Sequence, residues 1–180
     1  MDQCSQHAAE FASLGGGFTM DPSENSAHYN AHAYVYDQLQ AASGFNDPFE
    51  LAKTAVEKLG QPGQPLAAPD VRIVDFGCGS GLMGVELQKA GYTNISGIDG
   101  AAEMLARCVE KRIYKDTWKV LVGVTQIPVE ALYDPAVEGS GFDAVFCSAC
   151  MLKGHLPSDC YEYMLRVMRP GAHMLFSIRE

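Results

Sequence analysis

The chain has 180 residues, nearly half of them apolar, and a formal net charge of −9. This acidic balance, with few and dispersed Lys and Arg residues, argues against electrostatic capture of nucleic acid or of an anionic membrane. No apolar run approaches the ~20 residues of a membrane-spanning helix, and Met1-Asp-Gln-Cys4 lacks the basic region and apolar core of a secretory signal. We therefore expect a cytoplasmic protein with one globular domain and a small or neutral substrate.

The first third of the sequence predicts a tail followed by two helices. Residues 1–26 are rich in Gly, Ser and Asp without apolar periodicity, which predicts a mobile tail. Residues 26–37 predict a helix in which Tyr29 and Tyr36, seven residues apart, project from one face, either as a lid over a site or as an anchor to the domain. A second helix is expected to begin at Asn46 or Asp47, with an apolar face of Leu51, Ala52, Val56 and Leu59.

A glycine-rich loop follows the first expected strand. Residues 71–76 are mostly apolar and run into Gly77, Gly79 and Gly81, and residues 82–90 predict a helix whose free N–H groups suit a carboxylate or phosphate. A second short strand, residues 94–98, ends on Asp99, eighteen residues past Gly81. In a βαβ unit an acidic side chain at this place binds ribose hydroxyls, so the sequence predicts a nucleoside ligand with an anionic end.

The loop departs from the dinucleotide-binding fingerprint in two ways. The third glycine of that fingerprint would fall at Leu82, and Asp75 lies two residues before Gly77. A carboxylate at this position is unfavourable beside a pyrophosphate but useful beside an ammonium or a sulfonium. These residues disfavour a nicotinamide oxidoreductase and favour S-adenosylmethionine as the ligand.

Residues 74–81, Val-Asp-Phe-Gly-Cys-Gly-Ser-Gly, resemble motif I of the class I S-adenosylmethionine-dependent methyltransferases. Residues 142–145 and 165–171 resemble the fourth-strand motif and the motif before the fifth strand of the same family. A narrower resemblance, to the small Williams–Beuren-region methyltransferase-like proteins, rests on the tyrosine helix before Asp37, the Gly91-Tyr92 turn and residues 151–157. The resemblance covers the chain from about residue 27 onward and implies S-adenosylmethionine as the cofactor.

The remaining sequence alternates expected strands and helices. Strands are expected at residues 118–122, 142–147 and 172–178, helices at residues 101–112 and 158–168, and a turn at residues 169–171. This pattern predicts an α/β fold with a doubly wound, Rossmann-like parallel sheet over residues 71–180, in a methyltransferase-like domain that spans residues 27–180 and begins with N-terminal helices in residues 27–60. Five strands are visible, and the C-terminal hairpin strands usual in the family are missing. The open strand edge predicts either a truncated sequence or self-association through the fifth strand.

The resemblance implies a role for individual residues around the cofactor. The loop glycines would approach the methionine part, Asp75 would attract its amino group, and Asp99 would accept both ribose hydroxyls. Gly100 and Met104 would line the adenine, while plain helix-to-sheet packing explains Met104 equally well. Family members usually have an Asp where this chain has Val124, and Thr125 or Gln126 is expected to replace it. The expected cofactor-binding set is Tyr29, Tyr36, Asp75, Gly77, Cys78, Gly79, Gly81, Asp99, Gly100, Met104, Thr125, Gln126 and Cys147.

Methyl transfer asks little of a protein, because the sulfonium is already activated and in-line positioning supplies much of the rate. A general base is needed only for an acceptor that must lose a proton. His155 follows the fourth expected strand and titrates near neutrality, so it is the candidate catalytic base, with a solvated loop histidine as the alternative. The sequence thus predicts a methyltransferase that acts on a small molecule. The alternative is a non-catalytic, S-adenosylmethionine-binding or regulatory module, favoured by Val124 and the missing hairpin.

The cysteines and histidines also raise the question of a metal site. Cys147 and Cys150 have C-x-x-C spacing, and Cys160 follows ten residues later. A structural zinc site needs four ligands, and positions i and i+3 of a strand face opposite sides, so we expect buried reduced thiols and no metal. His28 and His32 are spaced as in H-E-x-x-H, but the intervening glutamate is absent, which excludes a metalloprotease.

Overall fold

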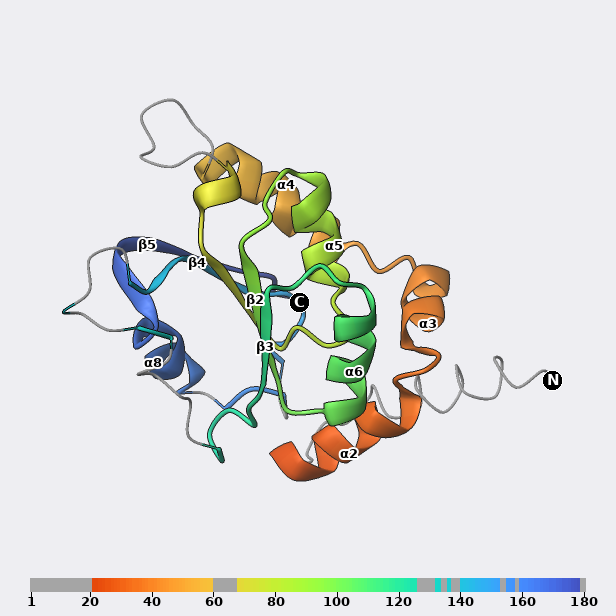
Figure 1. Cartoon of the computed structure of the whole chain (residues 1–180). Coiled ribbons are helices and arrows are strands. Elements are labelled where there is room, and N and C mark those ends of the chain that lie inside the picture. Colours follow the sequence, from red (N-terminus) through yellow and green to blue (C-terminus); the bar gives the residue numbers. More distant parts are fainter. Residues whose placement is uncertain are drawn as a thin grey trace.

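The computed structural model describes residues 21–59, 68–125, 132–133, 136, 140–152, 155–157 and 159–178. Within these ranges the chain forms a five-stranded parallel sheet with helices on both faces (Figure 1). The strand order is β3-β2-β1-β4-β5, which confirms the expected doubly wound, Rossmann-like α/β fold. The strands are β1 (Ile73–Phe76), β2 (Ile95–Asp99), β3 (Asp116–Lys119), β4 (Phe142–Cys147) and β5 (Met168–Phe176).

Two apolar cores, one on each face, hold the sheet between its helices. Helices α4 (Asp47–Leu59), α5 (Leu82–Lys89) and α6 (Ala102–Glu110) cover one face, and α8 (Cys160–Leu165) covers the other (Figure 1). Ile73 packs in the core with α4 and α5, whereas its neighbour Val74 packs in the core with Met164 of α8, as expected from the two-residue repeat of a strand. None of the described helices is long and apolar enough to cross a membrane.

The sheet has a topological switch point beside β1. This strand pairs with β2 on one side and with β4 on the other, so the direction in which the strands are added reverses here. In open α/β sheets, ligands bind outside the carboxyl ends of the strands at such a point. The glycine-rich loop after β1 and the loops after β2 and β4 meet at this crevice.

Strand β4 has the predicted bounds, but the two edge strands differ from expectation. β3 was expected at residues 118–122 and instead pairs Asp116 to Lys119 with Ser96 to Asp99, which leaves residues 120–122 beyond the sheet. β5 was expected from residue 172 and begins at Met168, opposite Phe142, with a register shift before Ala144. Residues 169–171, expected to form a turn, are therefore part of an irregular strand. Within the described ranges, β5 pairs only with β4.

The N-terminal segment forms two short helices where one helix was expected. Helix α2 (Pro22–His32) begins after Asp21, whose carboxylate accepts hydrogen bonds from the amides of Ser23 and Glu24. Residues 22–26, expected in the tail, are thus helical, and residues 1–20 lie outside the described ranges. A second helix, α3 (Tyr36–Ser43), begins after a break. Tyr29 and Tyr36 therefore belong to different helices, so the prediction that they share one helix face was wrong.

The other helices differ from the predictions in a buried position or in their bounds. In α4, Val56 is 48% exposed and Ala55 is fully buried in its place, because the buried face follows positions 51, 52, 55 and 59. α6 ends at Glu110, two residues before the predicted end. α8 is shorter than the expected 158–168, since Met168 already belongs to β5.

Candidate cofactor and active site

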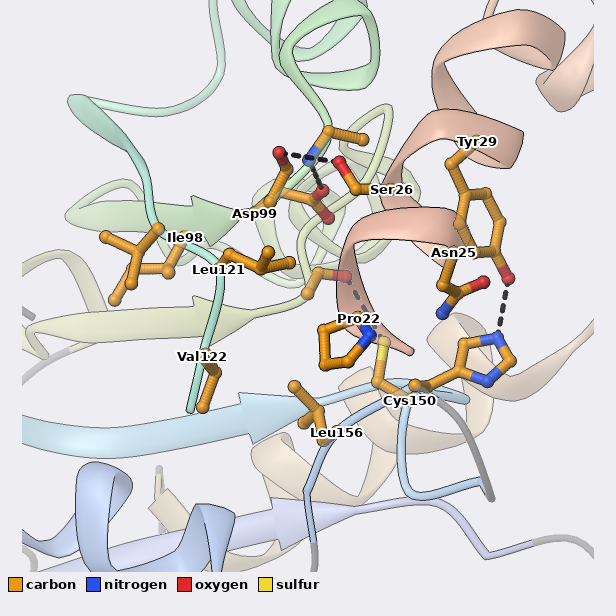
Figure 2. A pocket seen from close by; sticks show the side chains of 15 residues that line it. Pro22, Asn25, Ser26, Tyr29, Ile98, Asp99, Leu121, Val122, Cys150 and Leu156 are labelled. Carbon is orange, nitrogen blue, oxygen red and sulfur yellow. Dashed lines mark hydrogen bonds between the residues drawn. The ribbon is translucent and has the colours of Figure 1, made fainter. Parts of the chain in front are cut away.

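Two adjoining cavities lie at the switch point. The first, which we call the Asp99 cavity, is shown in Figure 2; the second is the glycine-loop cavity. Tyr29, Gly77, Cys150 and His155 line both and form the junction between them. The Asp99 cavity is also lined by Pro22, Asn25, Ser26, Ile98, Asp99, Gly100, Ala101, Val120, Leu121, Val122 and Leu156. The glycine-loop cavity is also lined by Tyr36, Phe45, Pro48, Cys78, Gly79, Ser80, Leu82, Met83, Met104, Ser148 and Ala149.

Asp99 lies at the end of β2, where its carboxylate connects two loops. Its Oδ2 accepts a hydrogen bond from the Gly79 amide at 2.8 Å, and its Oδ1 accepts one from the Ala101 amide at 2.7 Å. Burial raises the pKa of Asp99, and hydrogen bonds from backbone amides partly oppose that rise. A carboxylate has about four acceptor positions, so these two bonds leave capacity for hydroxyl donors in the cavity.

The loop after β1 brings its backbone close to other elements. Gly77 and Gly79 have φ angles of 72° and 53°, in the left-handed region that favours glycine. A Cβ at Gly77 would overlap the Cys150 thiol, and one at Gly79 would lie 3.3 Å from Cε of Met104. Both glycines line the glycine-loop cavity. Gly81 lines neither cavity and instead allows α5 to approach Cys108 of α6.

Asp75 lies beneath the loop, away from the cavity surface. It is fully buried, and its Oδ2 accepts a hydrogen bond from the Tyr114 hydroxyl at 2.6 Å. Its Oδ1 has no hydrogen-bond partner within the described part of the chain. Burial raises the pKa of Asp75 to about 7, the Tyr114 hydrogen bond opposes that rise, and the charge of Asp99 adds to it.

Helices α2 and α3 form an arm that closes over both cavities. Ser26 Oγ donates a hydrogen bond to the Gly100 carbonyl at 2.9 Å (Figure 2). Asn30 Oδ1 accepts one from the Glu103 amide at 2.8 Å and so caps α6. Asp37 accepts a hydrogen bond from Ser80 in the glycine loop and pairs with Lys111 at 2.8 Å.

The arm also reaches the loop after β4. The Tyr29 hydroxyl and Nε2 of His155 are 2.7 Å apart and share a hydrogen bond (Figure 2). The two rings meet edge to face at 5.7 Å. His28 lies next to this pair on α2, 4.5 Å from the ring of His32. Burial lowers the pKa of His28, and the charges of His32 and His155 lower it further, so the neutral imidazole is favoured here.

Similarity to known proteins agrees with this geometry. Residues 73–171, more than half of the chain, match the methyltransferase domain family. The chain is 31% identical over 153 residues to methyltransferase-like protein 27 of Homo sapiens, a match that covers 84% of this chain and 56% of that protein. The chain belongs to the class I S-adenosylmethionine-dependent methyltransferases. Its cofactor is therefore S-adenosylmethionine, as the sequence predicted.

Two further matches are to proteins whose chains are longer than this one. It is 29% identical over 163 residues to the ubiquinone biosynthesis O-methyltransferase of Alkalilimnicola ehrlichii, with 87% of this chain and 64% of that protein covered. The structure of an S-adenosylmethionine-dependent methyltransferase from Clostridium acetobutylicum superimposes with a TM-score of 0.52 at 18% identity, covering 82% of this chain and 56% of that one. The chain thus spans less than two thirds of the curated relatives named here.

Most residues expected to bind the cofactor lie at the two cavities of the methyltransferase. Met104 is 2% exposed and both lines the glycine-loop cavity and packs against Tyr29 and Tyr36. Cys78 lines the same cavity, although a Cβ at Gly97 would lie 2.8 Å from its sulfur, so its side chain points toward β2. The cavity-lining members of the expected set are Tyr29, Tyr36, Gly77, Cys78, Gly79, Asp99, Gly100 and Met104, together with His155.

Four members of the expected set line neither cavity, and one lies outside the described residues. Cys147 is fully buried in the core under α8, because its position in β4 turns it away from the crevice. Thr125 is exposed and donates its amide to the Leu121 carbonyl at 2.7 Å. Asp75 is fully buried and lines neither cavity, and Gly81, the N-cap of α5, lines neither cavity either. Gln126 is not among the described residues.

Sequence reasoning missed the residues that follow β3. Val120, Leu121 and Val122 line the Asp99 cavity, since β3 ends at Lys119. These residues are visibly apolar in the sequence, but the same apolar run is typical of a buried strand. Ser26 was also missed, because it lies at the expected boundary between the tail and the first helix.

Proposed function

We propose that this chain transfers the methyl group of S-adenosylmethionine to a hydroxyl group of a small-molecule acceptor. The observation that carries the proposal is the junction at which the Asp99 cavity and the glycine-loop cavity meet. A nucleoside in the first cavity and an amino-acid tail in the second would place the sulfonium near Gly77, Cys150, Tyr29 and His155. The chain's formal charge of −9 supports a small, uncharged or cationic acceptor over nucleic acid.

The residues of both cavities fit the cofactor. Asp99 retains acceptor capacity for ribose hydroxyls, and Val120, Leu121 and Leu156 give the same cavity an apolar wall for the base. The buried carboxyl of Asp75, with one oxygen unpartnered in the described structure, suits a ligand with positive charge. When bound, the cofactor supplies an activated methyl group.

The Tyr29–His155 pair would handle the proton of a hydroxyl acceptor. Both side chains line the junction, and their shared hydrogen bond leaves the Tyr29 oxygen able to accept another proton donor. During the transfer, the proton of the acceptor hydroxyl would pass to the Tyr29 oxygen while the Tyr29 proton passes to His155 Nε2. A relative named as an O-methyltransferase supports oxygen as the acceptor atom.

Transfer of a labelled methyl group tests the proposal. Wild-type protein is incubated with methyl-labelled S-adenosylmethionine and panels of hydroxyl, thiol, amine and carboxylate acceptors. Transfer to hydroxyl acceptors is expected, and His155→Gln should turn over at least tenfold more slowly at saturating cofactor. His173→Gln in β5, outside both cavities, is the matched control.

The second candidate is a module that binds the cofactor without transferring its methyl group. Val124, where the family usually has an Asp, is exposed and lines neither cavity. No side-chain carboxylate of residues 120–125 is therefore present for the adenine amino group. Cofactor binding with no transfer to any acceptor class would favour this module over the enzyme.

A further inference from the structure

Tyr114 occupies a slot that only glycine backbones leave open. A Cβ at Gly81 would lie 3.1 Å from Cε2 of Tyr114, and one at Gly97 would lie 3.0 Å from its Cδ1. A Cβ at Gly84 would overlap the ring itself and lie 2.7 Å from the hydroxyl oxygen. The glycines come from α5, its N-cap and β2. The phenol ring therefore passes between these elements toward the interior.

At the end of the slot the Tyr114 hydroxyl makes two hydrogen bonds. It accepts one from the Gly84 amide at 2.9 Å and donates one to Asp75 Oδ2 at 2.6 Å. Gly84 lies in the first turn of α5, where backbone amides have no intrahelical acceptor. The N-cap residue is Gly81, which has no side chain to accept a hydrogen bond from these amides. Burial raises the pKa of Tyr114 well above its ordinary value, so the phenol keeps its proton and remains a donor.

The acidic group that Tyr114 holds lies in β1, the strand that leads into Gly77 at the cavity junction. Asp75 is two residues before Gly77, which lines both cavities. Its side chain is fully buried, with Oδ1 lacking a hydrogen-bond partner among the described residues. Within the described ranges, its titratable neighbours are Tyr114, Asp99 of β2, Cys78 of the glycine loop and Cys150 after β4. All four are neutral or negative, so none of them favours the ionised carboxylate by its charge.

We propose that Tyr114 positions Asp75 as a proton-exchanging group, so that binding of the positively charged cofactor releases a proton from Asp75. The proposal rests on the cofactor position proposed above. In the free protein, burial and the charge of Asp99 favour the protonated carboxyl, and the pKa of about 7 places half of it in that form near neutrality. A cation at the junction stabilises the carboxylate, and the released proton goes to the buffer.

The sign of the pH dependence follows from this exchange. Below about pH 7 the cofactor must bind to a protein whose Asp75 is protonated, so affinity should rise by up to about tenfold per pH unit and level off above that pH. S-adenosylhomocysteine has the same amino-acid end but no sulfonium, so its affinity should depend less on pH. The Tyr114 hydrogen bond lowers the pKa of Asp75, so losing it should move the levelling-off point to higher pH.

Calorimetry from pH 5.5 to 8.5, in two buffers of different ionisation enthalpy, tests the proposal. Wild type should release more protons on binding S-adenosylmethionine than on binding S-adenosylhomocysteine, and Asp75→Asn should remove the difference. Tyr114→Phe should shift the levelling-off point upward. Tyr92→Phe is the matched control, because Tyr92 is also buried and donates to the Ala55 carbonyl at 3.1 Å; it should leave the profile unchanged.

The outcomes separate this inference from the proposed cofactor site. Wild-type protein that binds both ligands with equal proton release would overturn the inference and leave the cofactor site in place. This measurement uses only the wild-type protein, so it does not depend on the folding of a variant. A uniform loss of affinity at all pH values in Tyr114→Phe would overturn the role of Tyr114 in setting this exchange. Failure to bind S-adenosylmethionine at any pH would overturn the cofactor site and this inference together.

Discussion

The Tyr29 hydroxyl and His155 Nε2 are 2.7 Å apart, although 126 positions separate them in the sequence. Their hydrogen bond joins the N-terminal arm to the loop after β4 at the place where both cavities meet. The arm is therefore part of the site wall. This arrangement supports the expectation of a lid, and the packing of Tyr29 and Tyr36 against Met104 shows that the same tyrosines also anchor the arm.

A double-mutant cycle measures the coupling between these two residues. Tyr29→Phe and His155→Gln should each weaken S-adenosylmethionine binding several-fold, and the double variant should bind almost as well as either single variant. A coupling energy of about 1 kcal/mol is expected, because each single variant already removes the same hydrogen bond. The matched pair Tyr161→Phe and His173→Gln lies outside both cavities and should show no coupling. Additive losses at Tyr29 and His155 would mean that the bond does not contribute to binding.

Asp99→Ala should weaken S-adenosylmethionine binding by roughly 1.5–3 kcal/mol, the range for hydrogen bonds to a charged group. Because Asp99 also accepts from the amides of Gly79 and Ala101, the variant should lose stability as well, by about 1–3 kcal/mol. Calorimetry well below the melting temperature separates the two effects. Asp116→Ala, an exposed acidic residue of β3, is the control. Unchanged affinity in folded Asp99→Ala would move the ribose site elsewhere.

Gly84→Ala tests the slot occupied by Tyr114. Helix propensity alone favours alanine at this position of α5 by about 1 kcal/mol. The added Cβ would overlap the Tyr114 ring, so we expect net destabilisation of about 1–3 kcal/mol in urea unfolding. In the Tyr114→Ala background the overlap is absent, and the same substitution should be neutral or stabilising. Equal destabilisation in both backgrounds would show that Tyr114 does not fill the slot.

Asp75→Asn should change how stability depends on pH in the cofactor-free protein. The pKa of Asp75 is raised from 3.8 to about 7 on folding, so its stabilising contribution is fully present below pH 4 and is lost as the pH rises toward 7. The unfolding free energy of wild type, relative to Asp75→Asn, should therefore fall by up to about 1.4 kcal/mol per pH unit across that window. Urea unfolding from pH 4.5 to 8 measures it. Parallel curves for the two proteins would contradict the raised pKa.

Local patterns allowed much of the fold to be predicted. The strand before Gly77, the helix after it and Asp99 at the end of β2 follow from glycine spacing and apolar runs, and β4 was predicted with its observed bounds. β3 was misplaced because its position depends on pairing with residues 96–99, which sequence periodicity does not report. The break between Tyr29 and Tyr36 was missed for a similar reason, since each helix docks on a different part of the domain.

Long-range contacts explain what the sequence analysis missed at the site. Tyr114 binds Asp75 across 39 positions, and neither residue carries a local pattern that predicts the other. A partial signal was Gly84 in the first turn of α5, because glycine is unfavourable in a helix unless a large group packs against it. Cys147 was wrongly assigned to the cofactor because the alternation of β4 alone does not say which face meets the crevice.

The central claim is that the two cavities together hold S-adenosylmethionine, and calorimetry of the wild-type chain with three ligands tests it most directly. S-adenosylmethionine and S-adenosylhomocysteine should bind with one site each, and NAD should bind far more weakly or not at all. Tighter binding of NAD than of either S-adenosyl ligand, or no binding of S-adenosylmethionine, would contradict the account.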